Sequence, residues 1–250
     1  MPNEDLRALL DSSERVQLRA GDVLYEPGRP IHHVYFPLSC IVFLLAAAHR
    51  GGGPLAVNLV GCEGMIGAPL GLGVDENPTR ALVRSSGAAL RIPNAEFRAA
   101  LRHSAPLRRT LLRYVYVRLA DLAQEVWCAH FHRIESRLAR WLLMAQDGAR
   151  SDVFRFKHQV LAETLGVRRS GISVAAAELK AQGIITYSRG SITLLDRAGL
   201  QERACSCYRH SVQTYERILG GPLETPARAP AARDPMELGA MANRPESISV

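Results

Sequence analysis

FKHQVLAETLGVRRSGISVAAAELKAQGIITYSRGSITLL, residues 156–195, is the stretch that predicts how the C-terminal part of the chain folds. Apolar residues recur at helical intervals over 158–165, and Gly166 follows where a left-handed residue closes a helix. A second helix is expected over 169–182, with Gly183 at its end. Two short helices across a glycine-containing turn form a helix-turn-helix. The residues expected on its buried side are Val160, Leu161, Leu165, Ile172, Ala176 and Leu179.

The outer face of the second helix is small and almost uncharged beyond its first turn. Such a face fits into the major groove of DNA, where Arg169 can place two donors on guanine and Ser170 can bond either kind of base. Val174 can touch a thymine methyl group. Arg168 and Ser173, with the backbone N–H groups at the helix start, are better placed for phosphate.

Residues 184–187 and 192–194 predict two short strands joined by the turn over 188–191, which contains Gly190. This hairpin forms a wing, and Arg189 at its tip is expected to touch the DNA backbone. A helical hairpin that only packs is the alternative, because the helix-turn-helix spacing alone is a weak signal. The arginine pair and the wing together favour nucleic-acid binding.

Residues 161–200, LAETLGVRRSGISVAAAELKAQGIITYSRGSITLLDRAGL, resemble the C-terminal winged helix of the Crp/Fnr transcription regulators. The resemblance implies an α+β fold with an N-terminal β-roll (jelly-roll-like) sensor domain, a long dimerisation helix and a winged helix-turn-helix. The expected segments are a cyclic-nucleotide-binding-like roll over 1–104, the dimerisation helix over 105–131, the DNA-binding domain over 132–220 and a disordered tail over 221–250, which is rich in proline and alanine.

Net charge is +7, and it is unevenly distributed. Residues 1–100 carry 9 basic and 10 acidic side chains, whereas residues 101–250 carry 22 and 14. The basic excess therefore lies in the half with the helix-turn-helix, as expected for a phosphate-binding module joined to a near-neutral domain.

Short glycine-punctuated strands are expected in residues 16–93 and indicate a barrel or jelly roll. AGDVLYEPG followed by VYFPLSCIVFLL resembles the β-roll of the cyclic-nucleotide-binding fold in the same regulators. Strands are predicted at 55–59, 79–85 and 88–92, and a helix over 1–14.

The effector pocket departs from the pattern of relatives that bind cyclic AMP. Those relatives carry a Gly-Glu-Leu-Gly turn for the ribose, but here the turn from Gly64 to Gly67 has Met65 in place of the carboxylate. Thr79 occupies the position of the phosphate-binding arginine, and Arg80 is shifted by one residue, which turns a strand side chain to the opposite face. We therefore expect that the roll does not bind cyclic AMP in the usual way, and the effector is left open.

A long helix is expected over 107–130, with a heptad seam that a second copy of the chain can cover. A second apolar set packs on the roll, so an ordinary buried helix is the alternative. The proposed dimer-interface residues are Leu112, Val115, Leu119, Leu122 and Val126. Further helices are expected over 95–101, 134–146 and 200–219, and Leu200, Cys207, Val212 and Tyr215 are candidates for the packed side of the last.

The cysteines predict no metal site. The chain has 5, with no CxxC pair and no plausible set of four zinc ligands. A redox or metal role for the only close pair, Cys205 and Cys207, is the minor alternative, because His210 is its only neighbouring ligand. An iron–sulfur sensor resembling Fnr would need cysteines near the N-terminus, yet the first is Cys40. We expect no cofactor, no metal ligands and no catalytic residues.

These observations favour a homodimeric, sequence-specific DNA-binding transcription regulator in the cytoplasm, with double-stranded DNA as its partner and no membrane segment. The resemblance adds RNA polymerase and a small-molecule effector as further partners. Two alternatives stay open, a nucleotide-binding adaptor without DNA binding and a metal-dependent cupin-like enzyme. Cupins place two histidines one residue apart, which the adjacent pair His32 and His33 does not satisfy.

Overall fold

Two antiparallel sheets form the N-terminal roll of the computed structural model, which describes residues 3–46, 55–188 and 190–221. One sheet has the order β1-β7-β3, and the other has the order β2-β6-β4-β5. The expected roll is confirmed. Its strands are β1 (Glu14–Leu18), β2 (Val23–Tyr25), β3 (His33–Pro37), β4 (Ile41–Ala46), β5 (Leu55–Val60), β6 (Thr79–Ser85) and β7 (Gly87–Pro93).

Strand β4 is buried on both faces, because its alternate side chains enter two different cores. Val42 packs inside the roll with Val34, Ile66 and Val83. Phe43 and its neighbours on the other face pack against the C-terminal domain. Three short helices, α1 (Asn3–Asp11), η1 (Ala68–Leu72) and α2 (Asn94–His103), complete the roll.

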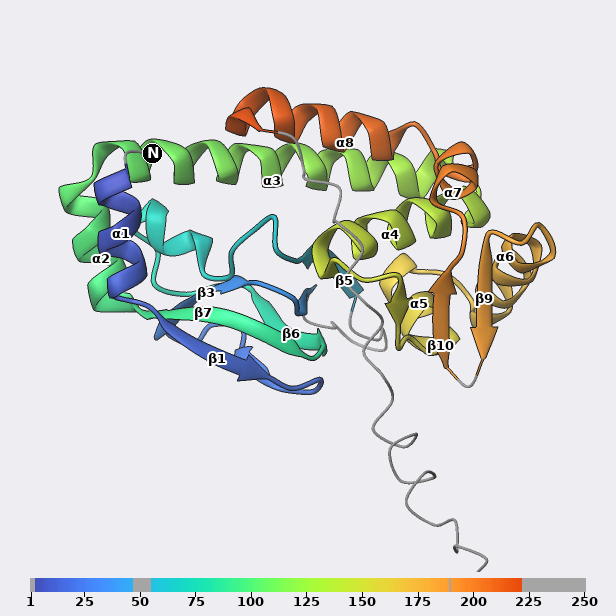
Figure 1. Ribbon diagram of the computed structural model, residues 1–250, viewed down its shortest axis with the longest axis horizontal. Coiled ribbons are helices and arrows are strands. Elements are labelled where there is room, and N and C mark those ends of the chain that lie inside the picture. The colour runs from blue at the N-terminus through green and yellow to red at the C-terminus, as the bar shows by residue number, and fades with distance from the viewer. Residues whose placement is uncertain (1–2, 47–54, 189, 222–250) are drawn as a thin grey trace, which may run out of the picture.

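Helix α3 (Ala105–Phe131) runs along the whole molecule above the roll and the C-terminal domain (Figure 1). Ser104 caps its start, since its Oγ accepts a hydrogen bond from the Leu107 N–H at 3.0 Å. Leu107, Leu111 and Tyr114 face the core of the roll, as expected for one of its two apolar sides. Neither α3 nor any other helix in the described part of the chain is long and apolar enough to cross a membrane.

The C-terminal domain contains the predicted helix-turn-helix and wing. Helix α4 (Ile134–Ala149) precedes α5 (His158–Leu165) and α6 (Arg169–Ala181). Strands β9 (Ile185–Ser188) and β10 (Ser191–Leu194) pair as the predicted hairpin, and β8 (Val153–Phe154) adds a third strand in the order β8-β10-β9. The sequence did not reveal β8, which has only 2 residues.

The prediction of a single closing helix over 200–219 is wrong. Helix α7 (Arg197–Arg203) ends at Ala204, whose extended backbone (ψ 146°) breaks it before α8 (Cys207–Tyr215) and the following π-helical turn η2 (Glu216–Gly220). Figure 1 shows α8 lying alongside α3.

The same break corrects the expectation that Cys205 and Cys207 lack neighbouring ligands. It brings both thiols next to Cys128 and His132 at the end of α3, and the four ligand atoms lie within 4.8 Å of one another. His210, the neighbour considered from the sequence, is not part of this group.

The roll packs directly on the C-terminal domain. The ring of Phe43 lies edge-on to Trp141 at 5.8 Å and stacks on Phe156 at 6.1 Å. A Cβ atom on Gly61 would lie 2.2 Å from the Cα of Gly148 at the end of α4, so glycine is required at this close approach. One hydrophobic core therefore spans both domains.

Candidate nucleic-acid interface

The turn between α5 and α6 is built by a left-handed glycine. Gly166 has φ 63° and ψ 38°, and the Val167 N–H that follows donates to the Ala162 carbonyl at 2.9 Å. Arg168 is extended and forms the N-cap of α6, which has no side-chain cap. No capping side chain therefore occupies the first-turn N–H groups of α6, which leaves them available to an anion such as a phosphate.

The buried side of the helix-turn-helix is the one that the sequence predicts. Leu161, Ile172 and Leu179 are fully buried, while Leu165, Ala176 and half-buried Val160 join the same core. Sequence reasoning missed Arg137 on α4, which is 8% exposed and donates from Nη2 to the Leu165 carbonyl at 2.5 Å. A cation at the last carbonyl of α5 satisfies a helix end at the turn itself.

The outer face of α6 is exposed where the sequence predicts DNA contacts. Arg168, Arg169 and Ser170 are exposed, and Val174 is 59% exposed although it is apolar. Ser173 is half-buried. The five residues thus share one surface around the first two turns of α6.

Ser173 is held by a contact that the sequence did not indicate. Its hydroxyl donates to the Arg169 carbonyl at 3.1 Å, and the Nδ1 of His158 lies 3.0 Å from the Oγ of Ser173. His158 also stacks on Tyr187 of the wing, with ring centroids 4.3 Å apart. Burial, and after it the charge of Arg169, lowers the pKa of His158. The neutral imidazole therefore links α5, α6 and the wing beneath the predicted DNA-binding face.

The wing has the two predicted strands with bounds that differ by one residue, and Ser188 lies opposite Ser191 across a tighter turn than expected. Gly190 has φ 81°, a conformation that this tight turn needs. Arg189, predicted to contact the DNA backbone, lies outside the described residues, as do residues 222–250 of the predicted tail.

Four of the five predicted dimer-interface residues are exposed along α3. The exposed fractions are 47% for Leu112, 61% for Leu119, 37% for Leu122 and 62% for Val126. Val115 is half-buried and packs against the core of the roll instead.

The predicted effector turn is closed by a tyrosine. The hydroxyl of Tyr114 accepts a hydrogen bond from the Met65 N–H at 3.1 Å, and a Cβ on Gly64 would lie 2.5 Å from this oxygen. Gly67 has φ 96°, and a side chain there would meet Val34. The turn is therefore filled by α3 and β3.

Thr79 and Arg80 have partners within the roll. The Thr79 N–H and hydroxyl both donate to Oδ1 of Asn77, at 3.0 and 2.7 Å, and Nδ2 of Asn77 donates to the Tyr25 hydroxyl at 3.0 Å. Arg80 is 44% exposed and pairs with Glu26 at 3.1 Å. The two neighbours thus have different partners, as successive strand residues do.

Residues 136–203 match the model of a protein family described as the Crp-like helix-turn-helix domain. The chain carries a Crp-like helix-turn-helix domain. The match contains α5, α6 and the wing, together with most of α4 and all of α7. No protein among the curated sequences matches the chain.

Solved structures of regulators share the fold. FixK2 from Bradyrhizobium japonicum is 15% identical and covers 77% of this chain and 98% of its own, with a TM-score of 0.65. A putative Crp/Fnr transcriptional regulator from Eubacterium rectale is 15% identical and covers 81% and 94%, with a TM-score of 0.60. A Crp/Fnr regulator from Thermus thermophilus is 24% identical and covers 76% and 98%, with a TM-score of 0.57.

The resemblance inferred from residues 161–200 is thus confirmed by sequence for the Crp-like domain and by fold for the roll and α3. A roll, a long helix and a helix-turn-helix domain occur together in the regulator structures from Eubacterium rectale and Thermus thermophilus, as they do in this chain.

Proposed function

We propose that the chain is a homodimeric transcription regulator that reads specific DNA sequences with α6. The observation that carries the proposal is the exposed face of α6 within the Crp-like domain. Arg169, Ser170 and Val174 would contact base edges, and Arg168 and Ser173 would contact phosphates. Such a protein acts on the chromosome in the cytoplasm, with double-stranded DNA as its partner.

The exposed apolar stripe on α3 supports the homodimer. Leu112, Tyr116, Leu119 and Val126 are 47 to 62% exposed and follow one another at helical intervals of three, four and seven residues. A second copy of α3 is the occupant whose spacing fits this stripe. Two Crp-like domains would then face DNA half-sites about one helical turn apart.

The structure of the roll favours an effector that binds differently from cyclic AMP. The Tyr114 hydroxyl closes the turn at Met65, and Thr79 is hydrogen-bonded to Asn77. Met65 therefore offers no carboxylate for a ribose, and Thr79 offers no guanidinium for a cyclic phosphate. An effector of the roll would change how α3 packs and thereby shift the population of DNA-binding conformations. RNA polymerase is a further proposed partner.

Selection of bound sites from random duplexes tests the central claim. The expected product is a symmetric pair of half-sites, and binding should weaken steeply with salt because phosphates are neutralised. Failure to bind any duplex, or binding without salt dependence, would refute the proposal and favour a nucleotide-binding adaptor. Thermal shifts with cyclic mononucleotides and dinucleotides would test for an effector.

Two neighbouring arginines give a sharper test of the readout. We expect Arg169→Ala to lose discrimination at one base pair per half-site by about 1–3 kcal/mol. Arg168→Ala should instead weaken specific and random DNA alike, and Arg102→Ala, on the exposed surface of α2, should change neither. An equal loss on specific and random DNA for Arg169→Ala would refute its assignment to a base.

A further inference from the structure

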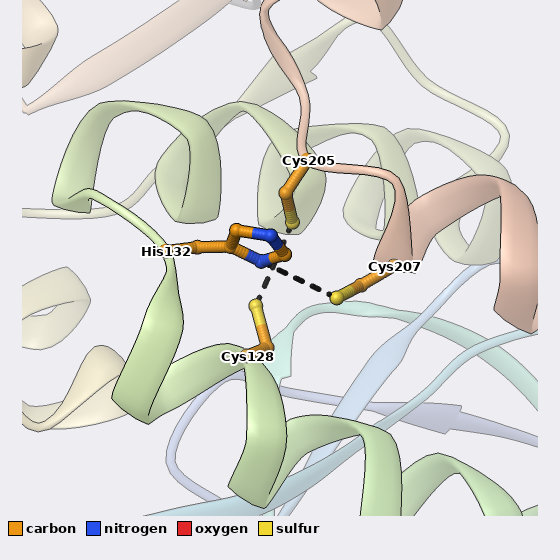
Figure 2. A group of neighbouring side chains, drawn as sticks. All are labelled: Cys128, His132, Cys205 and Cys207. Atoms are coloured by element: carbon orange, nitrogen blue, oxygen red, sulfur yellow. Dashed lines mark hydrogen bonds between the residues drawn. The ribbon is translucent and has the colours of Figure 1, made fainter.

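Four metal-ligating side chains converge at the far end of α3 (Figure 2). Cys128 lies in the last turn of α3, and His132, four residues later, is the extended C-cap residue that ends this helix. Cys205 and Cys207 come from the break between α7 and α8. Each side chain turns its sulfur or ring nitrogen toward the others, and all four ligand atoms lie within 4.8 Å of one another.

The spacing of the ligand atoms fits a tetrahedral ion. The sulfurs of Cys128 and Cys205 are 3.6 Å apart, and the sulfur of Cys207 is 3.4 Å from Nδ1 of His132. A tetrahedral zinc site with its usual bond lengths separates two sulfurs by about 3.8 Å and a sulfur from a nitrogen by about 3.5 Å. These two pairs already have nearly the distances that a shared ion would impose.

We infer that Cys128, His132, Cys205 and Cys207 bind one Zn²⁺ ion per chain. Three thiolates and one imidazole suit this metal, and four protein ligands fill its coordination shell, which indicates a structural rather than a catalytic ion. Binding would release the three thiol protons to solvent while the imidazole stays neutral. The inference does not depend on DNA binding.

The surroundings favour a metal over a disulfide or a simple apolar cluster. A disulfide requires sulfurs about 2.05 Å apart, which Cys128 and Cys205 at 3.6 Å do not have. Nε2 of Gln124 donates to the sulfur of Cys207 at 2.9 Å, as an outer hydrogen bond to a metal-bound thiolate does. An iron–sulfur cluster would distribute its ligands over several iron atoms, whereas these four surround one point.

The ion would clamp the DNA-binding domain to the dimerisation helix. Its ligands lie on both sides of the chain from α4 to α7, which contains the whole Crp-like match. Cross-linking the end of α3 to the start of α8 would fix where that domain leaves α3. Loss of the ion should therefore release α8 from its place alongside α3.

Metal analysis of the full-length protein, purified under reducing conditions from zinc-containing medium, is the direct test. We expect one zinc per chain by mass spectrometry of the metal. Replacement by Co²⁺ should give the visible absorption of tetrahedral cobalt together with thiolate-to-cobalt charge-transfer bands. Removing zinc with a chelator should lower the melting temperature of the wild-type protein.

Matched variants assign the ligands. Cys207→Ser and His132→Ala should lose the stoichiometric zinc, and the chelator should no longer change their melting temperatures. Cys62→Ser, a half-buried cysteine on the roll, and His210→Ala, an exposed histidine three residues after Cys207, should keep one zinc per chain.

Wild-type protein that holds no stoichiometric zinc and gives no thiolate bands with Co²⁺ would overturn the inference, whatever the variants do. A disulfide between Cys128 and Cys205 in the purified protein would also overturn it, as would equal loss of zinc from the control variants. None of these results concerns the selection of DNA sites by α6. The zinc proposal and the DNA-binding proposal can therefore be refuted independently.

Discussion

Replacing Leu119 by alanine should weaken association of two chains without weakening the fold of either. Leu119 is 61% exposed on the apolar stripe of α3, so in a single chain most of its side chain contacts solvent. Alanine also has the higher helix propensity, which leaves α3 at least as stable. A loss of association would therefore reflect the interface between chains.

The expected magnitude follows from the area that a partner would cover. Leucine to alanine removes three carbons worth roughly 0.8 kcal/mol each on burial, or about 1.5 kcal/mol for the exposed three-fifths of the side chain. Both chains of the dimer carry the change, which doubles the loss to about 3 kcal/mol and raises the dissociation constant about 100-fold.

Sedimentation equilibrium across a concentration series measures this dissociation constant directly. Leu195→Ala is the matched control, because Leu195 is 60% exposed but lies beyond the wing rather than on α3. It should leave the dissociation constant unchanged. A wild-type protein that is monomeric at micromolar concentration, or equal dissociation constants for the Leu119 variant and wild type, would refute the assignment of the stripe to a second copy.

Three further changes test how the domains are held together. Gly61→Ala should lower the free energy of unfolding by about 1–3 kcal/mol, because its Cβ would collide with the backbone of Gly148. Arg137→Met should lower it by about 1.5–3 kcal/mol, because it removes a charged donor from the Leu165 carbonyl. His158→Gln should flatten the pH dependence of unfolding. The lowered pKa means that the folded chain binds fewer protons, so the stability from His158 is complete above pH 6.5 and is lost as the pH falls below it.

Urea denaturation measures all three effects, at pH 7.5 for the first two and from pH 7.5 to 5 for the third. The matched controls are Gly221→Ala, which has open space around it, and Arg133→Met and His210→Gln, which alter exposed side chains. A control that changes unfolding as much as its test variant would contradict the contact assigned to that variant.

The sequence predicted local structure well wherever a strong terminator accompanied the periodicity. The helix over 158–165 has its expected bounds, and the strand expected over 192–194 begins one residue earlier, because Gly166 and Gly190 mark the turns. The prediction of one closing helix was wrong because the sequence has no such terminator there. No glycine or proline marks the break after Ala204, and a tertiary arrangement overrides the local helical pattern there.

The cysteine cluster could not be predicted either, because it depends on the same tertiary arrangement. Cys128 and Cys205 are 77 residues apart, so nothing in the spacing of the cysteines joins them. The spacing of four residues between Cys128 and His132 was the available signal, and it becomes informative only once Cys205 and Cys207 are known to lie beside them. His158 was missed because Tyr187, which it stacks on, comes from another element.

The two faces of β4 suggest how the roll can act on the DNA-binding domain without passing through α3. Val42 on one face packs inside the roll, and Phe43 on the other packs on Trp141 of α4. Helix α4 also carries Arg137, whose hydrogen bond holds the end of α5 at the turn before α6. A shift of β4 therefore cannot repack one core without disturbing the other, since both are closely packed. An effector of the roll, as proposed above, would reach α6 by the direct route through β4 and α4 as well as by the longer route through α3. It would therefore move α6 even if the proposed pairing of two α3 helices stayed fixed.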